Sequence, residues 1–352
     1  MSNTKTLTAQ ERAQLFAMST RQNLQMLAKQ TATSGATTVS FNLPKARLLS
    51  KMLVNVKAKV KVKHASKTTL ETGVFTPYKL IRRWSLDLNN GFAPLTVSGE
   101  ELAMFNMVHL HGGIVKGGTN FRVCDELKAS AEGTVNEISY AVEIPVTLTE
   151  KEPIGLILLQ NESTNVNLTC DIASDNDFVS DIEGASAEIV SIEISPMLET
   201  FSIPTNASAM PDLSILKLVT GRNDSLPSEG QQIVKLSTGT IYRRILFKLV
   251  DENGNPMDTD SLMSNLSLVF NQADTNYDIS AEMLRTLNTR MYGFELPKGM
   301  YVFDFSYQGI ANAMCGTRDF IDTEKLTEFW LRFNTNKRGK IEIVTECLSR
   351  LV

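Results

Sequence analysis

Apolar and polar residues alternate without interruption between Val54 and Lys63. Every even position holds valine or alanine, and every odd position holds asparagine or lysine. Because successive side chains of a β-strand point to opposite faces, this pattern predicts a strand with one buried face and one solvated face. No regular alternation of strands and helices accompanies it, so the chain is typical of an all-β sandwich rather than a parallel α/β fold. Further strand-like runs occur at residues 142–149, 166–172, 189–195, 233–236, 266–270, 301–307, 329–333 and 341–347.

The first 35 residues carry a different signal. Thr8 and Glu11 have the spacing of a capping box, and helix-favouring residues without Pro or Gly run from residue 9 to residue 29. Their apolar side chains spread around the predicted helix instead of forming one stripe, which favours packing between protein surfaces over binding to a membrane surface. The small polar residues 31–35 end this helix. We therefore assign residues 1–35 to an N-terminal helical arm.

A short pattern occurs twice along the chain. Residues 98–106 read SGEELAMFN and residues 280–288 read SAEMLRTLN, each with a serine at the predicted start of a helix. A strand-like run that begins with two arginines and ends in Asn-Gly precedes each copy, at Arg82-Arg83 and at Arg243-Arg244. The repeat predicts two similar β-domains in tandem, each with one short helix.

The repeat also sets the expected domain boundaries. The proline-containing stretch at residues 197–211 is the best hinge, which gives a first domain at residues 36–200 and a second at residues 201–352. The helix of the second copy is expected to present an apolar face made of Met283, Leu284, Leu287 and Met291.

Charge is distributed unevenly. The first 70 residues contain nine Lys, three Arg and one Glu, although the whole chain has a formal net charge of −4. A basic N-terminal part joined to an acidic remainder indicates an anionic partner near this end, which is a phospholipid surface, nucleic acid or the acidic face of a neighbouring copy. The polar face of the first strand is interpreted as a solvated face that discourages edge-to-edge aggregation, with an anion or RNA site as the alternative. Its lysines are Lys57, Lys59, Lys61 and Lys63.

Motifs for catalysis or cofactor binding are missing from the sequence. The chain has no GxSxG elbow, no phosphate-binding loop and no dinucleotide fingerprint. His109 and His111 would share one face of a strand, but a metal site needs a third ligand, so ordinary strand histidines are preferred. The four cysteines lie far apart, which favours buried reduced thiols. We therefore expect no enzymatic activity and no cofactor.

Five acidic residues gather between positions 171 and 183. They lack the central glycine and the terminal glutamate of an EF-hand loop, so a solvated loop is preferred over a loosely held calcium ion. These residues are Asp171, Asp175, Asp177, Asp181 and Glu183.

Several segments resemble one protein family. They are the Gln-rich arm at residues 7–30, the run FTPYKLIRRW at residues 75–84 and the run LPKGMYVFD at residues 296–304. With the two tandem β-domains, they resemble the double jelly-roll major capsid proteins of tectiviruses, the membrane-containing tailless bacteriophages. The resemblance implies two tandem eight-stranded jelly rolls, each with a short helix, plus the N-terminal helical arm. It also implies long loops, such as residues 253–278, that would form towers or trimer contacts.

The resemblance also implies a role and partners. The chain would form a homotrimer with a six-sided outline that tiles an icosahedral shell. It would contact neighbouring capsomers, penton and minor capsid or membrane proteins, and the internal viral membrane through its arm, with no direct contact to nucleic acid. It would be made in the host cytoplasm and reside in the virion. The candidate membrane or inter-capsomer contacts are Arg12, Arg21, Lys29, Lys45, Arg47 and Lys51.

Two other functions are compatible with a β-sandwich. A receptor-binding or carbohydrate-binding protein needs an exposed aromatic platform, but the two tryptophans, Trp84 and Trp330, both lie in strand-like runs. A cupin-type enzyme needs a histidine cluster, and of the three histidines His64 is far from the other two in sequence. The structural role is therefore preferred.

Overall fold

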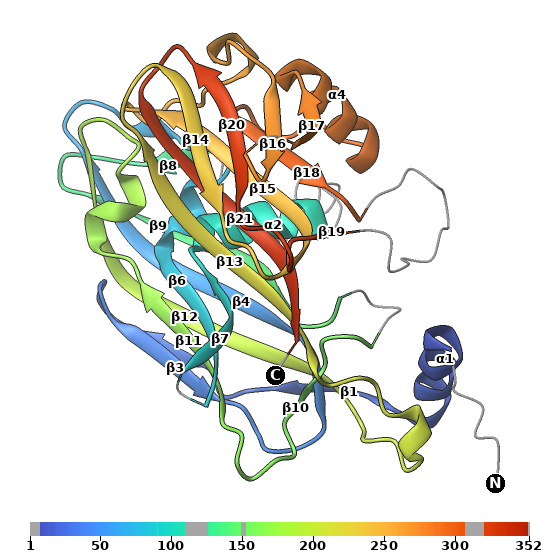
Figure 1. Cartoon of the computed structure of the whole chain (residues 1–352). Helices are drawn as coiled ribbons and strands as arrows, with labels where there is room; N and C mark the ends of the chain where they lie inside the picture. Colours follow the sequence, from blue (N-terminus) through green and yellow to red (C-terminus); the bar gives the residue numbers. More distant parts are fainter. Residues whose placement is uncertain are drawn as a thin grey trace, which may run out of the picture.

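The computed structural model describes residues 8–89, 91–109, 126–148, 153–272, 274–306 and 320–350. Among these residues, strands form two sandwiches, of which the second, coloured yellow to red, fills the upper part of Figure 1. Helix α1 (Ala9–Ser19) lies near the lower end of the view. Within the described ranges, no helix has both the length and the apolar character needed to cross a membrane.

The first sandwich, roll 1, consists of two sheets. In the usual lettering of jelly-roll strands, one sheet has the order B-I-D-G and the other C-H-E-F. The first sheet contains β1 (Gln22–Met26) and β2 (Gln30–Ala32) as strand B, then β12 (Ala185–Phe201), β4 (Leu48–His64) and β9 (Thr134–Pro145), with β10 (Ile157–Leu158) also on β4. The second contains β3 (Thr38–Asn42), β11 (Val166–Ile172), β6 (Ile81–Leu88) and β7 (Phe92–Val97).

The second sandwich, roll 2, repeats both strand orders. Its B-I-D-G sheet contains β13 (Ile215–Leu226), β21 (Gly339–Arg350), β15 (Ile241–Asp251) and β18 (Met300–Asp304), with β19 (Ile321–Asp322) also on β15. Its C-H-E-F sheet contains β14 (Gly230–Leu236), β20 (Phe329–Thr335), β16 (Leu266–Phe270) and β17 (Asp274–Ile279). In each roll one helix connects strand F to strand G: α2 (Gly99–His109) and α4 (Ala281–Tyr292). The prediction of two tandem eight-stranded jelly rolls, each with a short helix, is confirmed.

Small elements complete the described chain. They are the ribbon of β5 (Thr69–Glu71) with β8 (Glu126–Lys128), and the 3-10 helices η1 (Thr76–Leu80), η2 (Asp175–Val179), η3 (Ala207–Ala209) and η4 (Thr259–Ser261).

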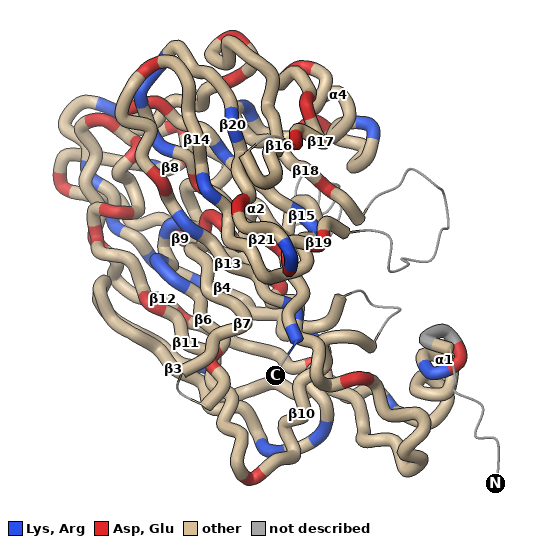
Figure 2. The backbone as a smooth tube through the Cα atoms, in the orientation of Figure 1, with Lys and Arg blue, Asp and Glu red and all other residues tan. Residues whose placement is uncertain are grey.

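Strand β4 confirms the alternation read from the sequence. Its valines from Val54 to Val62 are fully buried, whereas the intervening lysines reach solvent. Acidic residues of the neighbouring strands face these lysines: Lys57 is opposite Glu193 in the sheet register, and Lys59 Nζ lies 3.2 Å from Glu137 Oε1. Figure 2 shows acidic and basic positions interleaved over this part of the molecule. The lysine face is therefore one half of a charge-balanced, solvated sheet face.

The N-terminal helix is shorter than predicted. Helix α1 has the expected capping box of Thr8 and Glu11 but ends at Ser19, and Thr20 is already extended. The residues that follow form β1 and β2, which pair with β12. The prediction of a helix to residue 29 was wrong because hydrogen bonds to a strand about 170 residues away in sequence outweigh a modest local helix propensity.

The two halves of the predicted repeat have different outcomes. The helical halves are equivalent, since α2 and α4 both connect strands F and G. The arginine pairs are not equivalent, because Arg82-Arg83 lie in strand E (β6) and Arg243-Arg244 lie in strand D (β15). The expectation of a long loop at residues 253–278 was wrong, because these residues contain η4, β16 and most of β17.

The two rolls share one sheet, and the core of roll 1 includes side chains of roll 2. Strand β7 of roll 1 pairs in parallel with β13 of roll 2 through Leu95 and Val219, which makes a continuous nine-stranded sheet. Side chains of β15 alternate between two cores: Phe247 packs inside roll 2, whereas Leu246 belongs to the cluster that fills roll 1. The B-I-D-G sheet of roll 2 is therefore buried on both faces, and the chain passes from roll 1 to roll 2 between Phe201 and Ile215.

Candidate functional site: the junction between the two jelly rolls

Helix α2 lies between the two jelly rolls. Nine of its 11 residues are buried, and it contacts β6 and β9 of roll 1 as well as β21 of roll 2. A surface helix has one apolar stripe, whereas a helix enclosed by protein buries side chains on all sides. Helix α2 is of the second kind. The helix begins with a capping box at the predicted serine, with Ser98 N–H donating to Glu101 Oε2 and Glu101 N–H donating to Ser98 Oγ.

Ion pairs hold the first turn of α2 to roll 2. Lys248 on β15 pairs with Glu100 of α2, and its Nζ also lies 3.5 Å from Glu342 Oε2 on β21. The same ammonium group lies 5.4 Å from the ring centre of Phe75 in roll 1, a cation–π distance. One lysine therefore connects the helix, the sheet of roll 2 and an aromatic ring of roll 1.

Beside this anchor, the backbone of β13 comes very close to α2. A Cβ atom at Gly221 would lie only 2.0 Å from Glu101 Oε2, so any larger residue there would force the Glu101 carboxylate to move. Burial raises the pKa of Glu101 to about 7, in spite of the hydrogen bonds from Ser98 that act in the opposite direction. Glu101 is thus a close-fitting part of the junction and not a solvated acid.

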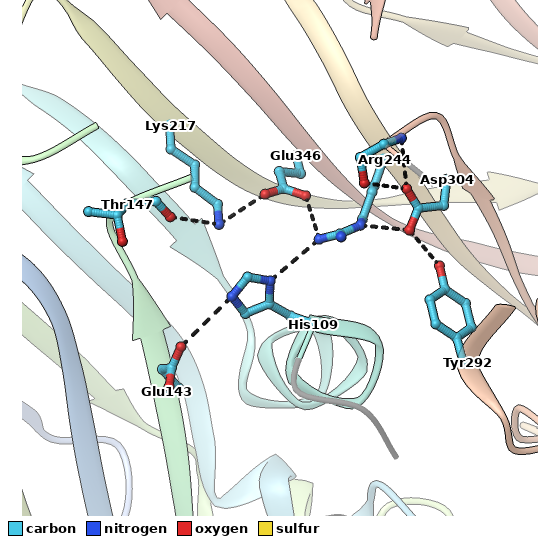
Figure 3. A network of polar contacts seen from close by, with 9 residues as sticks. His109, Glu143, Thr147, Lys217, Arg244, Tyr292, Asp304 and Glu346 are labelled. Carbon is cyan, nitrogen blue, oxygen red and sulfur yellow. Dashed lines mark hydrogen bonds and ion pairs between the residues drawn. The ribbon is translucent and has the colours of Figure 1, made fainter. Parts of the chain in front are cut away.

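The centre of the junction is a buried ion network (Figure 3). Lys217 Nζ on β13 lies 2.9 Å from Glu346 Oε1 on β21, and Arg244 Nη1 on β15 lies 2.9 Å from Glu346 Oε2. Arg244 Nε lies 2.8 Å from Asp304 Oδ2 on β18, which also accepts a hydrogen bond from Tyr292. The side chains of Lys217, Glu346 and Asp304 are at most 1% exposed. We call Arg244, Glu346 and Asp304 the roll 2 triad.

Charges within the network compensate for the cost of burying them. Burial alone would raise the pKa of Glu346, but the charges of Lys217 and Arg244 outweigh it and hold this pKa far below its ordinary value. Lys217 also reaches roll 1, where Nζ donates to the backbone oxygen of Thr147 at 3.2 Å and lies 5.2 Å from the ring centre of Phe105. Removal of Glu346 would leave Lys217 and Arg244 buried without the partner that they share.

His109, the last residue of α2, closes the network on the side of roll 1. Its Nδ1 lies 3.4 Å from Arg244 Nη1, and its Nε2 lies 3.8 Å from Glu143 Oε1. Burial is the main cause that lowers the pKa of His109 well below its ordinary value, and the charges of Lys217 and Arg244 lower it further. The ring is therefore neutral, and because arginine can only donate, Nδ1 accepts and the proton resides on Nε2.

Roll 1 contains the same ion arrangement on its own B-I-D-G sheet. Lys51 on strand D lies 3.8 Å from Glu199 on strand I and 3.8 Å from Glu143 on strand G, which are the three strands that carry the roll 2 triad. In the sheet register, Lys51 is directly opposite Glu199, and Arg244 is directly opposite Glu346. Each cation also comes directly after a register shift in strand D, which lies at Ser50 in roll 1 and at Arg243 in roll 2. A β-bulge re-aims the side chain next to it. We call Lys51, Glu199 and Glu143 the roll 1 triad.

Each connecting helix is fixed to strand G by the same asparagine contact. Asn106 Nδ2 donates to the backbone oxygen of Glu143 at 2.8 Å, and the backbone N–H of Glu143 donates to Asn106 Oδ1 at 2.6 Å. Asn288 makes the same pair of bonds with Val302, at 2.8 and 3.1 Å. These asparagines end the two copies of the sequence repeat, so the repeat encodes how the helix attaches to the sheet.

The two helices differ in what covers them. Only five of the 12 residues of α4 are buried, compared with nine of 11 in α2. Leu284 and Met291 face the core as predicted, but Met283 is 59% exposed and Leu287 is 43% exposed. The expected apolar face is therefore two faces, of which one is open to solvent within the described chain.

Helix α1 packs against the connection between the rolls. Phe16 is buried, and its ring centre lies 5.5 Å from that of Phe201. Of the predicted contact residues near it, Arg12 on α1 is half-buried and Arg21, which follows the helix, is exposed. Lys29 lies between β1 and β2, where it is exposed and its Nζ is 2.8 Å from Glu193.

The remaining predicted contact residues lie just before β4 or near its start. Lys45 and Arg47 are exposed in the connection from β3 to β4, and Lys45 Nζ donates to the Glu162 oxygen at 2.8 Å. Lys51 is held in the roll 1 triad, where its side chain is 21% exposed. The structure thus places Lys51 in an ion cluster within the chain and the other predicted residues nearer the surface.

The acidic cluster is distributed among separate contacts. Asp171 pairs with Arg83 at 3.0 Å, and Asp181 accepts from Thr76 and pairs with Lys79. Asp175 accepts from the Ile189 N–H, and Asp177 caps η2. Within the described ranges, no group of three or more His, Cys, Asp or Glu side chains is placed to hold a metal ion.

The histidine pair is placed differently from the expectation, whereas the two tryptophans lie in strands as expected. His109 ends a helix and is not in a strand, and His111 lies outside the described residues. Trp84 is fully buried and Trp330 is half-buried. Cys170 and Cys347 are buried free thiols as expected, whereas Cys124 and Cys315 lie outside the described residues.

These observations define the class of fold. Two B-I-D-G/C-H-E-F sandwiches in tandem, joined edge to edge with one helix enclosed between them, make the chain a double jelly roll. No protein-family model matches the sequence, and no curated protein sequence matches it either.

Solved structures of viral capsid proteins share this fold. The major capsid protein of Sulfolobus Turreted Icosahedral Virus matches with a TM-score of 0.67 at 14% identity, over 94% of this chain and 97% of that one. The capsid protein of the virus PBCV-1 matches with a TM-score of 0.65 at 10% identity, over 94% of both chains. The major capsid protein P2 of bacteriophage PM2 matches with a TM-score of 0.60 at 12% identity, over 94% and 98%. The chain thus has the fold of double jelly-roll major capsid proteins, and the narrower attribution to tectiviruses stays a prediction.

Sequence reasoning did not find the junction. The signal was present as single charges inside apolar strands, since Lys217 stands between Leu216 and Leu218, and Glu346 stands beside Cys347. A buried charge in such a place needs a partner of opposite sign. The partner could not be named from sequence, because Lys217 and Glu346 are distant along the chain and meet only through the pairing of β13 with β21.

Proposed function

We propose that this chain is a structural major capsid protein that trimerises into pseudo-hexagonal capsomers and tiles an icosahedral shell around an internal membrane. The observation that carries the proposal is the fold match, which extends over 94% of the chain with three viral capsid proteins and includes both jelly rolls. The proposed partners are neighbouring copies, vertex proteins and minor capsid or membrane proteins.

The junction gives a physical basis for this role. A shell subunit has to keep its shape while neighbours bind on several sides, and obligate contacts of this kind commonly bury more than about 2,000 Å². The shared sheet, the enclosed helix α2 and the buried ion network fix the two rolls as one rigid block. Three such blocks contain six rolls, which gives a trimer the outline needed to fill a hexagonal lattice.

The N-terminal arm is the proposed contact with the membrane and with adjacent capsomers. The candidates near the surface are Arg12, Arg21 and Lys29 in the arm and Lys45 and Arg47 after it, and each could contribute about 1 kcal/mol next to anionic lipid. Met18 on α1 is 85% exposed, so the helix also offers an apolar side chain to a partner. These weak contacts would act together over the many copies of a shell.

The assembly state of the purified protein tests the proposal. We expect light scattering to give the mass of three 39.0-kDa chains, and negative-stain images to show six-sided particles. A protein that stays monomeric at about 100 μM would contradict a role as capsomer.

A truncation tests the arm separately. Removal of residues 1–20 deletes α1 but keeps β1, which belongs to a sheet of roll 1. We expect folded trimers that bind vesicles of anionic phospholipid more weakly, because Arg12 and Met18 are lost, and that no longer assemble shells. The control is substitution of the exposed Lys59 and Lys63 by Gln on β4, which removes two charges from another surface. Equal vesicle binding by the truncated and the full chain would show that the arm has another role.

A further inference from the structure

The contact between roll 1 and roll 2 has two parts. The edge of strand F in roll 1 (β7) pairs in parallel with the edge of strand B in roll 2 (β13). The helix that follows strand F (α2) covers the outer face of the B-I-D-G sheet of roll 2, where its last residue, His109, meets Arg244. This contact is heterologous, because the F–G side of one roll meets the B-I-D-G side of another.

Each half of this contact is present a second time in the chain, where it has no partner in the described residues. Strand F of roll 2 (β17) ends its sheet, and so does strand B of roll 1 (β1). Helix α4 presents the open face that contains Met283 and Leu287. The surfaces left over by the chain are therefore the same two surfaces that meet inside it.

The B-I-D-G sheet of roll 1 is suited to receive such a helix. Leu24 and Met26 on β1 are 58% and 61% exposed. They are two positions apart in the strand, so both lie on the same face of the sheet. The same sheet carries the roll 1 triad, which matches the roll 2 triad strand by strand. An equivalent set of charges is covered in roll 2 and only partly covered in roll 1.

The charges next to the two edges are of opposite sign. Strand β17 carries Asp274 and Asp278, and the first turn of α4 carries Glu282. Strand β1 is flanked by Arg21 and Lys29. Complementary charges at the rim of an interface favour one pairing over its alternatives and speed association.

We propose that the internal junction is repeated between chains: α4 and the β17 edge of one copy dock on β1 and the B-I-D-G sheet of roll 1 in the next copy. This inference rests on the proposed function, since it names the surface through which capsomers form. A head-to-tail contact either closes into a ring or continues as a filament. A closed ring of three copies contains six rolls related by alternating internal and external junctions.

Two charged variants test the two halves of the interface. M283E/L287E changes α4, and L24E/M26E changes β1, and all four side chains are exposed in the single chain, so the fold should be retained. The thermal melting of each variant, held as a monomer by dilution, checks this. We expect each variant to be monomeric where the wild type is trimeric, with an apparent dissociation constant raised about 100-fold or more. The control is I233E, a change at a similarly exposed side chain on β14, which should leave the trimer intact.

Mixing the two variants tests the polarity of the contact. A copy with an intact α4 can still dock on a copy with an intact β1, so an equimolar mixture should give dimers that grow no further, measured by native mass spectrometry. A mixture that stays monomeric, or a trimeric M283E/L287E variant, would overturn the proposal. A trimeric L24E/M26E variant that has lost binding to anionic vesicles would instead assign β1 to the membrane. If the wild type itself never associates, the proposed function fails together with this inference, whereas a trimer insensitive to both variants refutes only the interface.

Discussion

Helices α2 and α4 occupy equivalent places in the two jelly rolls but have different surroundings. Both connect strand F to strand G, and both attach to strand G through an asparagine. The first is enclosed between the rolls, and the second keeps Met283 and Leu287 in solvent. The difference shows that the same supersecondary unit serves as an internal core element in one roll and as a free surface in the other.

The ion triads show the same contrast. The roll 2 triad is covered by roll 1 and joined by Lys217, whereas the roll 1 triad remains more accessible and has a longer separation of its charges. Burial makes the first triad sensitive to the loss of any one partner, because uncompensated charges in a low-dielectric interior are costly. Four measurements can break or sharpen this comparison.

The largest effect is expected for Glu346→Ala. This change leaves Lys217 and Arg244 buried next to each other, which should lower the free energy of unfolding by about 3–5 kcal/mol. The equivalent change in roll 1, Glu199→Ala, affects a pair at 3.8 Å and should cost about 1 kcal/mol. Urea denaturation of both variants gives the two values. Equal losses would show that the junction does not distinguish the triads.

A smaller and balanced effect is expected for the two asparagines. Asn106→Ala and Asn288→Ala each leave one backbone N–H and one backbone oxygen of strand G unpaired, which should cost about 2–4 kcal/mol. Denaturation midpoints should fall by similar amounts in both variants. A loss confined to one variant would mean that the repeat does not have the same role in both rolls.

The pH dependence of stability is expected to change in His109→Gln. The pKa of His109 is lowered in the folded chain, so below its ordinary value of 6.5 the unfolded chain binds the proton first and stability falls as the pH falls. Glu101 has the opposite sign, because its pKa is raised to about 7 and the folded chain takes up its proton first as the pH falls toward 4.5.

The wild type should therefore vary little between pH 7 and pH 5, whereas His109→Gln should gain about 1–2 kcal/mol relative to it over this range. Below pH 4.5 both proteins should lose stability, because the depressed pKa of Glu346 favours the folded chain only while the group is ionised. Unfolding free energies at pH 7, 6 and 5 provide the comparison, and parallel curves would contradict the assignment of His109.

The smallest effect is expected on the solvated face of roll 1. Lys59 and Glu137 are 57% and 76% exposed, so Lys59→Ala should change the free energy of unfolding by less than about 0.5 kcal/mol. The same denaturation assay applies. A loss above about 1 kcal/mol would indicate that this face is a structural site and not a solvated one.

Local periodicity allowed much of the fold to be predicted. The alternation in β4 and the two serine-capped helices are signals within a few residues, and both are confirmed. Prediction from the sequence failed where residues distant along the chain determine the local structure. In β1, hydrogen bonds to β12 form a strand where a helix was predicted. The arginine pairs looked alike because short strands share composition, although they occupy strands E and D.

The junction was beyond the reach of sequence for the same reason. Glu100 and Lys248 are 148 residues apart, and His109 and Arg244 are 135 apart. Each side chain looked ordinary in its own segment, and their meeting depends on how β7 and β13 bring the rolls together. The basic residues of the arm were readable from charge alone, but the fact that Lys51 belongs to an ion triad was not.

Peroxide oxidation of Met283, followed by peptide mass spectrometry, tests most directly whether α4 does between chains what α2 does within one. In the monomeric L24E/M26E variant, Met283 is exposed and should oxidise readily, whereas the buried Met257 should react slowly in every state. In the assembled wild type we predict oxidation of Met283 at least about tenfold slower than in that variant. Equal rates in the two proteins would contradict the account.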